Sequence, residues 1–149
     1  MSRKQRVLFL CIGNACRSQM AEAFARSYGS DVLVPFSAGL APAQQVPDDT
    51  LRAMDEKNLT LDGQFPKGMA DFAQEKFDFV INMSGFSAPY VAGAIVREWT
   101  VPDPVGMNYE NHCKVRDQIE DLVMKFILEL RRQEKTPRGS GLKFFRSPG

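Results

Sequence analysis

The sequence contains no long hydrophobic run, few cysteines and almost no net charge. No apolar stretch approaches the length that crosses a bilayer, and no signal-peptide cleavage site precedes the first apolar segment, so we expect a cytoplasmic protein without a membrane partner. Three cysteines are an odd number, and two of them fall in one short segment, which argues against a secreted disulfide framework. A formal net charge of +1 gives no indication of a nucleic-acid partner.

The chain also lacks internal repeats, and only its last part has the composition of a tail. Its 149 residues and 44% hydrophobic content are typical of one soluble globular domain. From residue 136 onward the sequence turns to proline, glycine, serine and basic residues. We therefore expect one folded domain over residues 1–135 and a disordered tail over residues 136–149.

Apolar segments of strand length alternate with segments of helical periodicity. Strands are predicted over residues 7–10, 32–36, 77–83 and 97–101, the first of them fully buried because no polar residue interrupts it. Pro35 indicates that the second strand lies at an edge of the sheet, and a turn is expected over residues 37–39. Helices are predicted over residues 18–28, from residue 48, over 69–75 and over 115–130. This order is typical of an α/β protein with an open parallel sheet.

Eight residues join the first strand to the first helix, and they are the most informative part of the sequence. They are Cys11, Ile12, Gly13, Asn14, Ala15, Cys16, Arg17 and Ser18. A loop of this kind turns its backbone N–H groups inward, where together with the helix N-terminus they bind a tetrahedral oxyanion. We therefore predict that the loop binds inorganic phosphate or a similar oxyanion.

Cys11 and Arg17 are the predicted reactive pair of this loop. The positive field of the loop would hold Cys11 as a thiolate nucleophile; the alternative is a small residue of the core. Arg17 would bind two oxygens of the anion through its planar guanidinium. A plain surface charge is the alternative for Arg17, but a cation in the first helical turn opposes the helix dipole unless an anion binds nearby.

Three further loop residues are predicted to support this pair. Gly13 lets the backbone approach the ligand. Asn14 tolerates a left-handed conformation and would hold the loop open, although an ordinary turn asparagine is the alternative. The hydroxyl of Ser18 would stabilise the thiolate and assist the departure of sulfur, whereas its simpler interpretation is a helix cap.

A candidate acid follows the predicted fourth strand. Asp103 stands between Pro102 and Pro104, so its carboxyl is expected at the carboxyl edge of the sheet, where the Cys11 loop also lies. Cleavage of a phosphate ester requires a proton for the departing oxygen, which Asp103 would supply; an ordinary turn is the alternative. The only histidine, His112, is interpreted as a capping or surface residue without a catalytic role.

The loop from Cys11 to Ser18, together with residues 37–39 and the pair Asp103 and Pro104, resembles the low-molecular-weight protein tyrosine phosphatases over residues 6–132. The resemblance implies a single-domain, four-stranded parallel sheet flanked by helices on both faces. It also implies a phosphomonoester hydrolase that needs no metal or cofactor and forms a phosphocysteine intermediate on Cys11. Asp103 would serve first as acid and then as base, and Cys16 would form a reversible disulfide with Cys11.

The sequence departs from this family at the predicted substrate slot. Familiar members carry aromatic residues directly after the Asp-Pro pair, whereas Val105 and Gly106 follow here and Tyr109 is the first aromatic residue. One wall of the slot is therefore missing, which weakens the expectation of phosphotyrosine as substrate. A phosphorylated protein or a small phosphomonoester remains the expected substrate class.

Two other functions are compatible with the same loop. Thioredoxin-coupled arsenate reductases resemble the sequence closely, but they pass oxidation to two further cysteines after the third strand, and residues 82–97 contain none. Cys16 and Cys113 are the only other thiols for such a relay. A non-catalytic phosphate-binding module is the third alternative, although it needs neither a nucleophile nor an acid.

Overall fold

The structure is a computed structural model that describes residues 3–135, so the predicted tail lies outside the described residues. In chain order the elements are β1 (Gln5–Cys11), α1 (Arg17–Tyr28), β2 (Leu33–Gly39), α2 (Asp48–Asp55), the 3-10 helix η1 (Met69–Phe72), β3 (Phe79–Asn82), β4 (Ile95–Glu98) and α3 (Tyr109–Lys135). Among these residues no helix is both long and apolar enough to span a membrane.

The four strands form one parallel sheet in the order β2-β1-β3-β4. Pro35 pairs with Val7 from the edge strand β2, as predicted. Residues 37–39, predicted as a turn, instead continue β2 and pair with residues 9–11 of β1. This prediction was wrong because a glycine is needed there for close approach: a Cβ on Gly39 would lie 2.6 Å from the carbonyl oxygen of Ile12.

Two further boundaries differ from the prediction. The fourth strand begins at Ile95 and ends at Glu98, so it shares only its last two residues with the predicted range of 97–101. Its residues are mostly exposed because β4 is the other edge of the sheet, so hydrophobic patterning marks it poorly. The predicted helix over 69–75 is a single 3-10 turn, which ends at Phe72.

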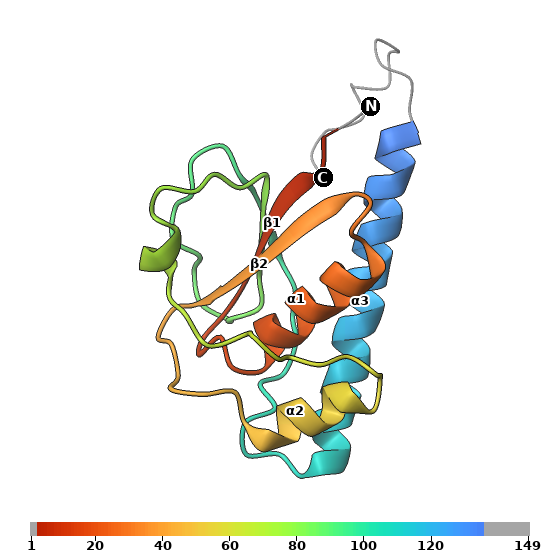
Figure 1. Cartoon of the computed structure of the whole chain (residues 1–149). Helices are drawn as coiled ribbons and strands as arrows, with labels where there is room; N and C mark the ends of the chain where they lie inside the picture. The colour runs from red at the N-terminus through yellow and green to blue at the C-terminus, as the bar shows by residue number, and fades with distance from the viewer. Residues whose placement is uncertain (1–2, 136–149) are drawn as a thin grey trace.

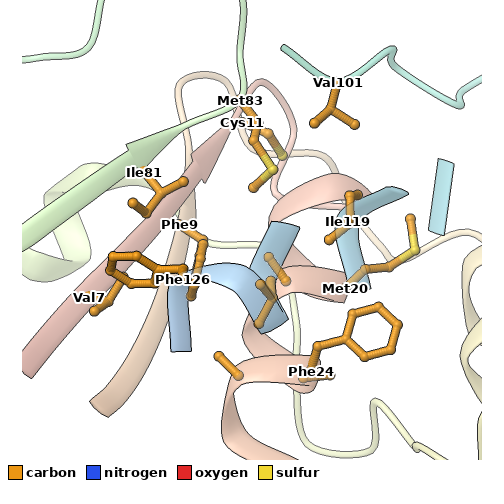
Figure 2. Close-up of a cluster of buried hydrophobic side chains, with 14 of the residues drawn as sticks. Val7, Phe9, Cys11, Met20, Phe24, Ile81, Met83, Val101, Ile119 and Phe126 are labelled. Carbon is orange, nitrogen blue, oxygen red and sulfur yellow. The ribbon is translucent and has the colours of Figure 1, made fainter. Parts of the chain in front are cut away.

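Alternate residues of β1 enter two separate hydrophobic clusters. Val7, Phe9 and Cys11 face the cluster formed with α1 and α3, part of which is drawn in Figure 2, whereas Leu8 and Leu10 face the other. In Figure 1 the α-helices lie on one side of the sheet, and the segment with η1 lies on the other. The predicted single α/β domain is thus confirmed, with a short 3-10 helix and loops covering the second face.

All four strands run in the same direction, so their carboxyl ends meet at one edge of the sheet. The loop after β1, the segment after β2, the turn after β3 and the segment with Asp103 after β4 all leave the sheet at this edge. Parallel α/β sheets bind their ligands at this edge. The fold therefore brings the predicted site residues to one place.

Candidate active site

The backbone of the loop is held from behind by the segment after β2. The amides of Leu40, Ala41 and Ala43 donate hydrogen bonds of 2.8–3.0 Å to the carbonyl oxygens of residues 11, 12 and 13. The amides of residues 12–16, in contrast, donate to no group within residues 3–135. With its carbonyls engaged on one side, the loop keeps several N–H groups for an oxyanion.

The thiol of Cys11 lies at the end of β1 beside a hydroxyl whose orientation is set by a third residue. The Sγ atom is 2.9 Å from Ser18 Oγ, and Asn14 Nδ2 donates to the same oxygen at 2.7 Å. Because Ser18 Oγ accepts from the Asn14 amide, its own hydrogen is free to point toward the sulfur. The three residues thus form a buried donor chain that ends on Cys11.

Asn14 itself is fixed in the left-handed conformation that the sequence predicted, with φ 50°. Its Oδ1 accepts from the backbone N–H of Lys67 at 2.9 Å and from Gln19 Nε2 at 3.1 Å. Gln19 also donates to the Phe65 carbonyl at 3.0 Å, which ties the segment before η1 to the loop. Sequence reasoning missed Gln19 and Lys67, because they contribute through contacts that only the folded chain creates.

Arg17 is the first residue of α1, and its guanidinium is anchored at the carboxyl edge of the sheet. Nη1 donates to the carbonyl oxygens of Met83 at 2.5 Å and Val101 at 3.1 Å. Met83 and Val101 belong to the same buried cluster as Cys11, and Figure 2 shows the three at its upper end. A cation so placed presents its second nitrogen, Nη2, toward the site.

A hydrogen-bonded turn after β3 fixes the Met83 carbonyl. The backbone N–H and the hydroxyl of Ser84 both donate to Asn82 Oδ1, at 3.0 and 2.7 Å. Asn82 Nδ2 in turn donates to the Phe86 carbonyl at 2.7 Å. The anchor of the guanidinium is therefore part of a rigid turn.

Asp103 approaches the guanidinium from the segment after β4. Its Oδ2 lies 3.6 Å from Arg17 Nη2, and its Oδ1 accepts from the Val105 amide at 3.1 Å. The Arg17 side chain is 6% exposed, whereas that of Asp103 is 44% exposed. The carboxyl thus stands at the mouth of the site with access to solvent, as expected of a group that exchanges protons.

The second thiol of the loop, Cys16, has a hydrogen-bond partner on α2. Thr50, on α2, donates its hydroxyl to Cys16 Sγ at 3.2 Å, and the same oxygen lies 3.0 Å from His112 Nε2 on α3. Burial raises the pKa of Cys16 to about 11, although the hydrogen bond from Thr50 acts in the opposite direction. His112, interpreted from the sequence as a capping or surface residue, is only 3% exposed, so its interpretation as a surface residue was wrong.

The remaining predicted residues complete the loop without adding reactive groups. Ile12 and Gly13 are partly exposed and Ala15 is buried. Cys113 lies on α3, and its thiol faces Glu56 of α2 at 3.9 Å. Within residues 3–135 no group of three or more histidine, cysteine, aspartate or glutamate residues is placed to hold a metal ion.

Comparison with known proteins identifies a family that this chain matches. The family model of low molecular weight phosphotyrosine protein phosphatases matches residues 6–136. The chain belongs to this family of enzymes. This confirms the resemblance seen in the sequence.

Several relatives within the family have arsenate reductase names. A glutaredoxin arsenate reductase from Synechocystis is 30% identical over 130 residues, which cover 85% of this chain and 98% of the relative. Arsenate reductase 2 from Bacillus cereus is 32% identical over 130 residues, covering 85% and 96%. A solved arsenate reductase in the phosphate binding state superposes with a TM-score of 0.76 at 29% identity, covering 85% of this chain and 98% of that one.

Proposed function

We propose that this enzyme hydrolyses phosphomonoesters through a phosphocysteine intermediate on Cys11. The observation that carries the proposal is the convergence of Cys11, Arg17 and Asp103 at one edge of the sheet, with the carboxyl 3.6 Å from the guanidinium. A phosphate-binding module would need the loop and the cation, but neither a thiol at its base nor a carboxyl at its mouth.

In the first step the Cys11 thiolate attacks phosphorus while the ester oxygen departs. The S–P bond forms, the P–O bond breaks, and protonated Asp103 gives its proton to the leaving oxygen. Arg17 and the loop amides bind the phosphoryl oxygens, where negative charge is concentrated in the transition state.

In the second step water hydrolyses the phosphocysteine. The Asp103 carboxylate takes a proton from the water as its oxygen attacks phosphorus, and the S–P bond breaks. The departing sulfur carries the electron pair, and the Ser18 hydroxyl, aimed by Asn14, stabilises it by a hydrogen bond. Inorganic phosphate then leaves the loop, and Asp103 is protonated again for the next cycle.

The substrate slot supports a broad choice of phosphomonoester, from small aryl phosphates to phosphorylated protein. Val105 is exposed, and Gly106 takes a φ of 84°, so neither provides an aromatic wall. Tyr109 is engaged elsewhere, because its hydroxyl donates to Glu56 at 2.7 Å and its ring lies 3.8 Å from the Arg52 guanidinium carbon. A phosphotyrosine ring would therefore be gripped on fewer sides than in family members that have the aromatic pair.

Arsenate reduction is the second candidate, and the names of the relatives favour it. Arsenate would bind in the same loop and form an S–As bond to Cys11 with loss of water. A second thiol would then attack the Cys11 sulfur, so that a disulfide forms and arsenite departs with the bonding electrons. Residues 82–97 hold no cysteine, so the second thiol would be Cys16 or the thiol of a partner such as thioredoxin or glutaredoxin.

Paired assays on one purified sample separate the candidates. If the enzyme is a phosphatase, we expect hydrolysis of p-nitrophenyl phosphate that disappears in Cys11→Ser. The activity should persist in Cys113→Ser, because the Cys113 thiol faces Glu56. The reductase predicts arsenate-dependent NADPH oxidation when thioredoxin or glutaredoxin and their reductases are supplied. Phosphate binding with neither activity would contradict both and favour the binding module. The cytoplasm, which keeps thiols reduced, is the compartment that suits either chemistry.

A further inference from the structure

A chain of polar groups runs through the protein interior behind the loop, and the proposed reaction does not use it. It connects Cys16 in the loop to Thr50 on α2 and then to His112 on α3, by contacts of 3.2 and 3.0 Å. The three residues are 3%, 0% and 3% exposed. Three separate elements thus each contribute one buried polar side chain to a single line.

The positions of the two loop thiols suggest a role for these hydrogen-bonded residues. Cys11 and Cys16 lie in the same hydrophobic cluster, and the charge of Cys11 contributes to the raised pKa of Cys16. With that pKa at about 11, Cys16 is a protonated thiol near neutral pH, and such a thiol is a poor nucleophile. Cys16 therefore needs a proton acceptor before it can attack another sulfur.

We propose that Thr50 and His112 accept the Cys16 proton when Cys16 forms a disulfide with oxidised Cys11. The proposal deepens the proposed function, because it rests on Cys11 being the reactive thiolate and describes how its oxidation is stopped at a reversible disulfide. Cys11 and Cys16 lie five positions apart in one loop and in one buried cluster, and closure requires their Cα atoms to come within about 7 Å of each other.

The reaction balances with a hydroperoxide as the oxidant. The Cys11 thiolate attacks one peroxide oxygen, the O–O bond breaks, and an alcohol or water leaves, so that Cys11 becomes a sulfenic acid. Cys16 sulfur then attacks Cys11 sulfur; the S–S bond forms, the S–O bond breaks, and the departing hydroxide takes a proton from solvent to become water. In the structure the Thr50 hydroxyl donates to Cys16 Sγ. For the transfer it rotates toward His112, so that Thr50 Oγ accepts the thiol proton while its own proton passes to His112 Nε2.

The charges around the chain fit a neutral acceptor. Burial lowers the pKa of His112 below its usual value of 6.5, and nearby Arg116 acts in the same direction. Asp49 and Asp103 act in the opposite direction on His112. Around Cys16, Arg17 favours loss of the proton and Asp103 opposes it. The imidazole is thus neutral near neutral pH, and Nε2 accepts a proton in the tautomer that carries its hydrogen on Nδ1.

The test measures disulfide formation after a pulse of hydrogen peroxide, by intact mass and peptide mapping. His112→Gln keeps an amide that can hydrogen-bond to Thr50 but cannot take its proton, and Thr50→Val removes the hydroxyl at nearly constant shape. Near neutral pH both variants should close the disulfide about tenfold more slowly than the wild type and accumulate Cys11 sulfinic acid instead. Thr50→Ser should restore the rate, and Thr60→Val, an exposed threonine elsewhere, should change nothing.

The pH profile separates proton transfer from simple packing. In His112→Gln the defect should shrink as the pH rises toward the pKa of Cys16, about 11, because hydroxide then removes the thiol proton. Equal rates in wild type and both variants, or a defect that is independent of pH, would overturn the proposal. Phosphatase activity before oxidation should be unchanged in all four variants. If the wild type itself shows no phosphatase activity, the proposed function is refuted, whereas the rates of disulfide closure still test the role of Thr50 and His112.

Discussion

Cys11 and Cys16 stand in the same loop, are 2% and 3% exposed, and each contacts one hydroxyl, yet their surroundings differ. The hydroxyl beside Cys11 belongs to Ser18, whose oxygen is occupied by the Asn14 amide, so its hydrogen is directed at the sulfur. The hydroxyl beside Cys16 belongs to Thr50, which is linked to an imidazole rather than to an amide donor.

The difference teaches that burial does not by itself make a cysteine reactive. Desolvation favours the neutral thiol, as the raised pKa of Cys16 shows. The proposed nucleophile needs donors that are fixed before the substrate arrives, and the fold supplies these on the Cys11 side through Asn14 and the amides of residues 12–16.

The largest expected effect comes from replacing each of the two loop cysteines by serine in separate variants. Cys11→Ser should lower p-nitrophenyl phosphate hydrolysis by at least about 1,000-fold, because a serine hydroxyl is not ionised in this loop. Cys16→Ser should retain a large part of the activity, since its side chain faces Thr50 and not the substrate. Steady-state kinetics at saturating substrate checks both, and comparable losses in the two variants would refute the assigned difference.

A smaller but more specific effect is expected at the acid. Asp103→Asn should slow substrates with poor leaving groups, such as alkyl phosphates, by about 100-fold or more, and p-nitrophenyl phosphate much less. The reason is that p-nitrophenolate departs without a proton. A leaving-group series gives the dependence directly, with Asp62→Asn, an exposed carboxyl elsewhere, as the control. Equal slowing across the series would count against proton donation by Asp103.

The two hydroxyls give a third test of the same comparison. Ser18→Ala should slow hydrolysis of the phosphocysteine about tenfold or more, because the departing thiolate loses its hydrogen bond. Thr50→Val should leave turnover unchanged. Rapid-quench measurement should then show a larger burst of p-nitrophenol for Ser18→Ala only. An identical response of the two variants would mean that the hydroxyls do not distinguish the thiols.

Sequence reasoning found the Cys11 side of the loop but not the Cys16 side. Residues 11–18 are contiguous, so their order alone indicates an oxyanion loop, and Asp103 is marked by its two flanking prolines. Thr50 contacts Cys16 and His112 only because α2 packs against the loop and α3, and these two partners are 34 and 62 positions away from Thr50 in the sequence. No local pattern carries that information.

The same distinction applies to the fold. The buried run of β1 and the apolar stripe of α3 were predicted because each element has one dominant environment. The end of β2 was mispredicted as a turn because Gly39 is required by the neighbouring loop, not by the bend of its own chain. The exposed edge strand β4 was misplaced because its residues bury little.

The smallest expected effect is on stability and concerns the only histidine. The pKa of His112 lies below 6.5 in the folded protein, whereas in the unfolded chain it returns to about 6.5. Between these values the unfolded state binds a proton that the folded state does not, so the free energy of unfolding should fall as the pH falls through this window. Carboxyl groups with lowered pKa values, such as Asp78, add their own loss only at more acidic pH.

His112→Gln isolates this contribution, because the amide occupies a similar place without titrating. Urea unfolding of wild type and variant between about pH 7 and pH 5 should show a decline for the wild type and a flatter profile for His112→Gln. If both profiles decline equally, the pKa of His112 is the same in the folded and the unfolded protein, and the fold does not favour the neutral imidazole as we infer. The stability measurement thus tests, without any enzyme assay, whether the side of the loop that holds Cys16 ends in a neutral base.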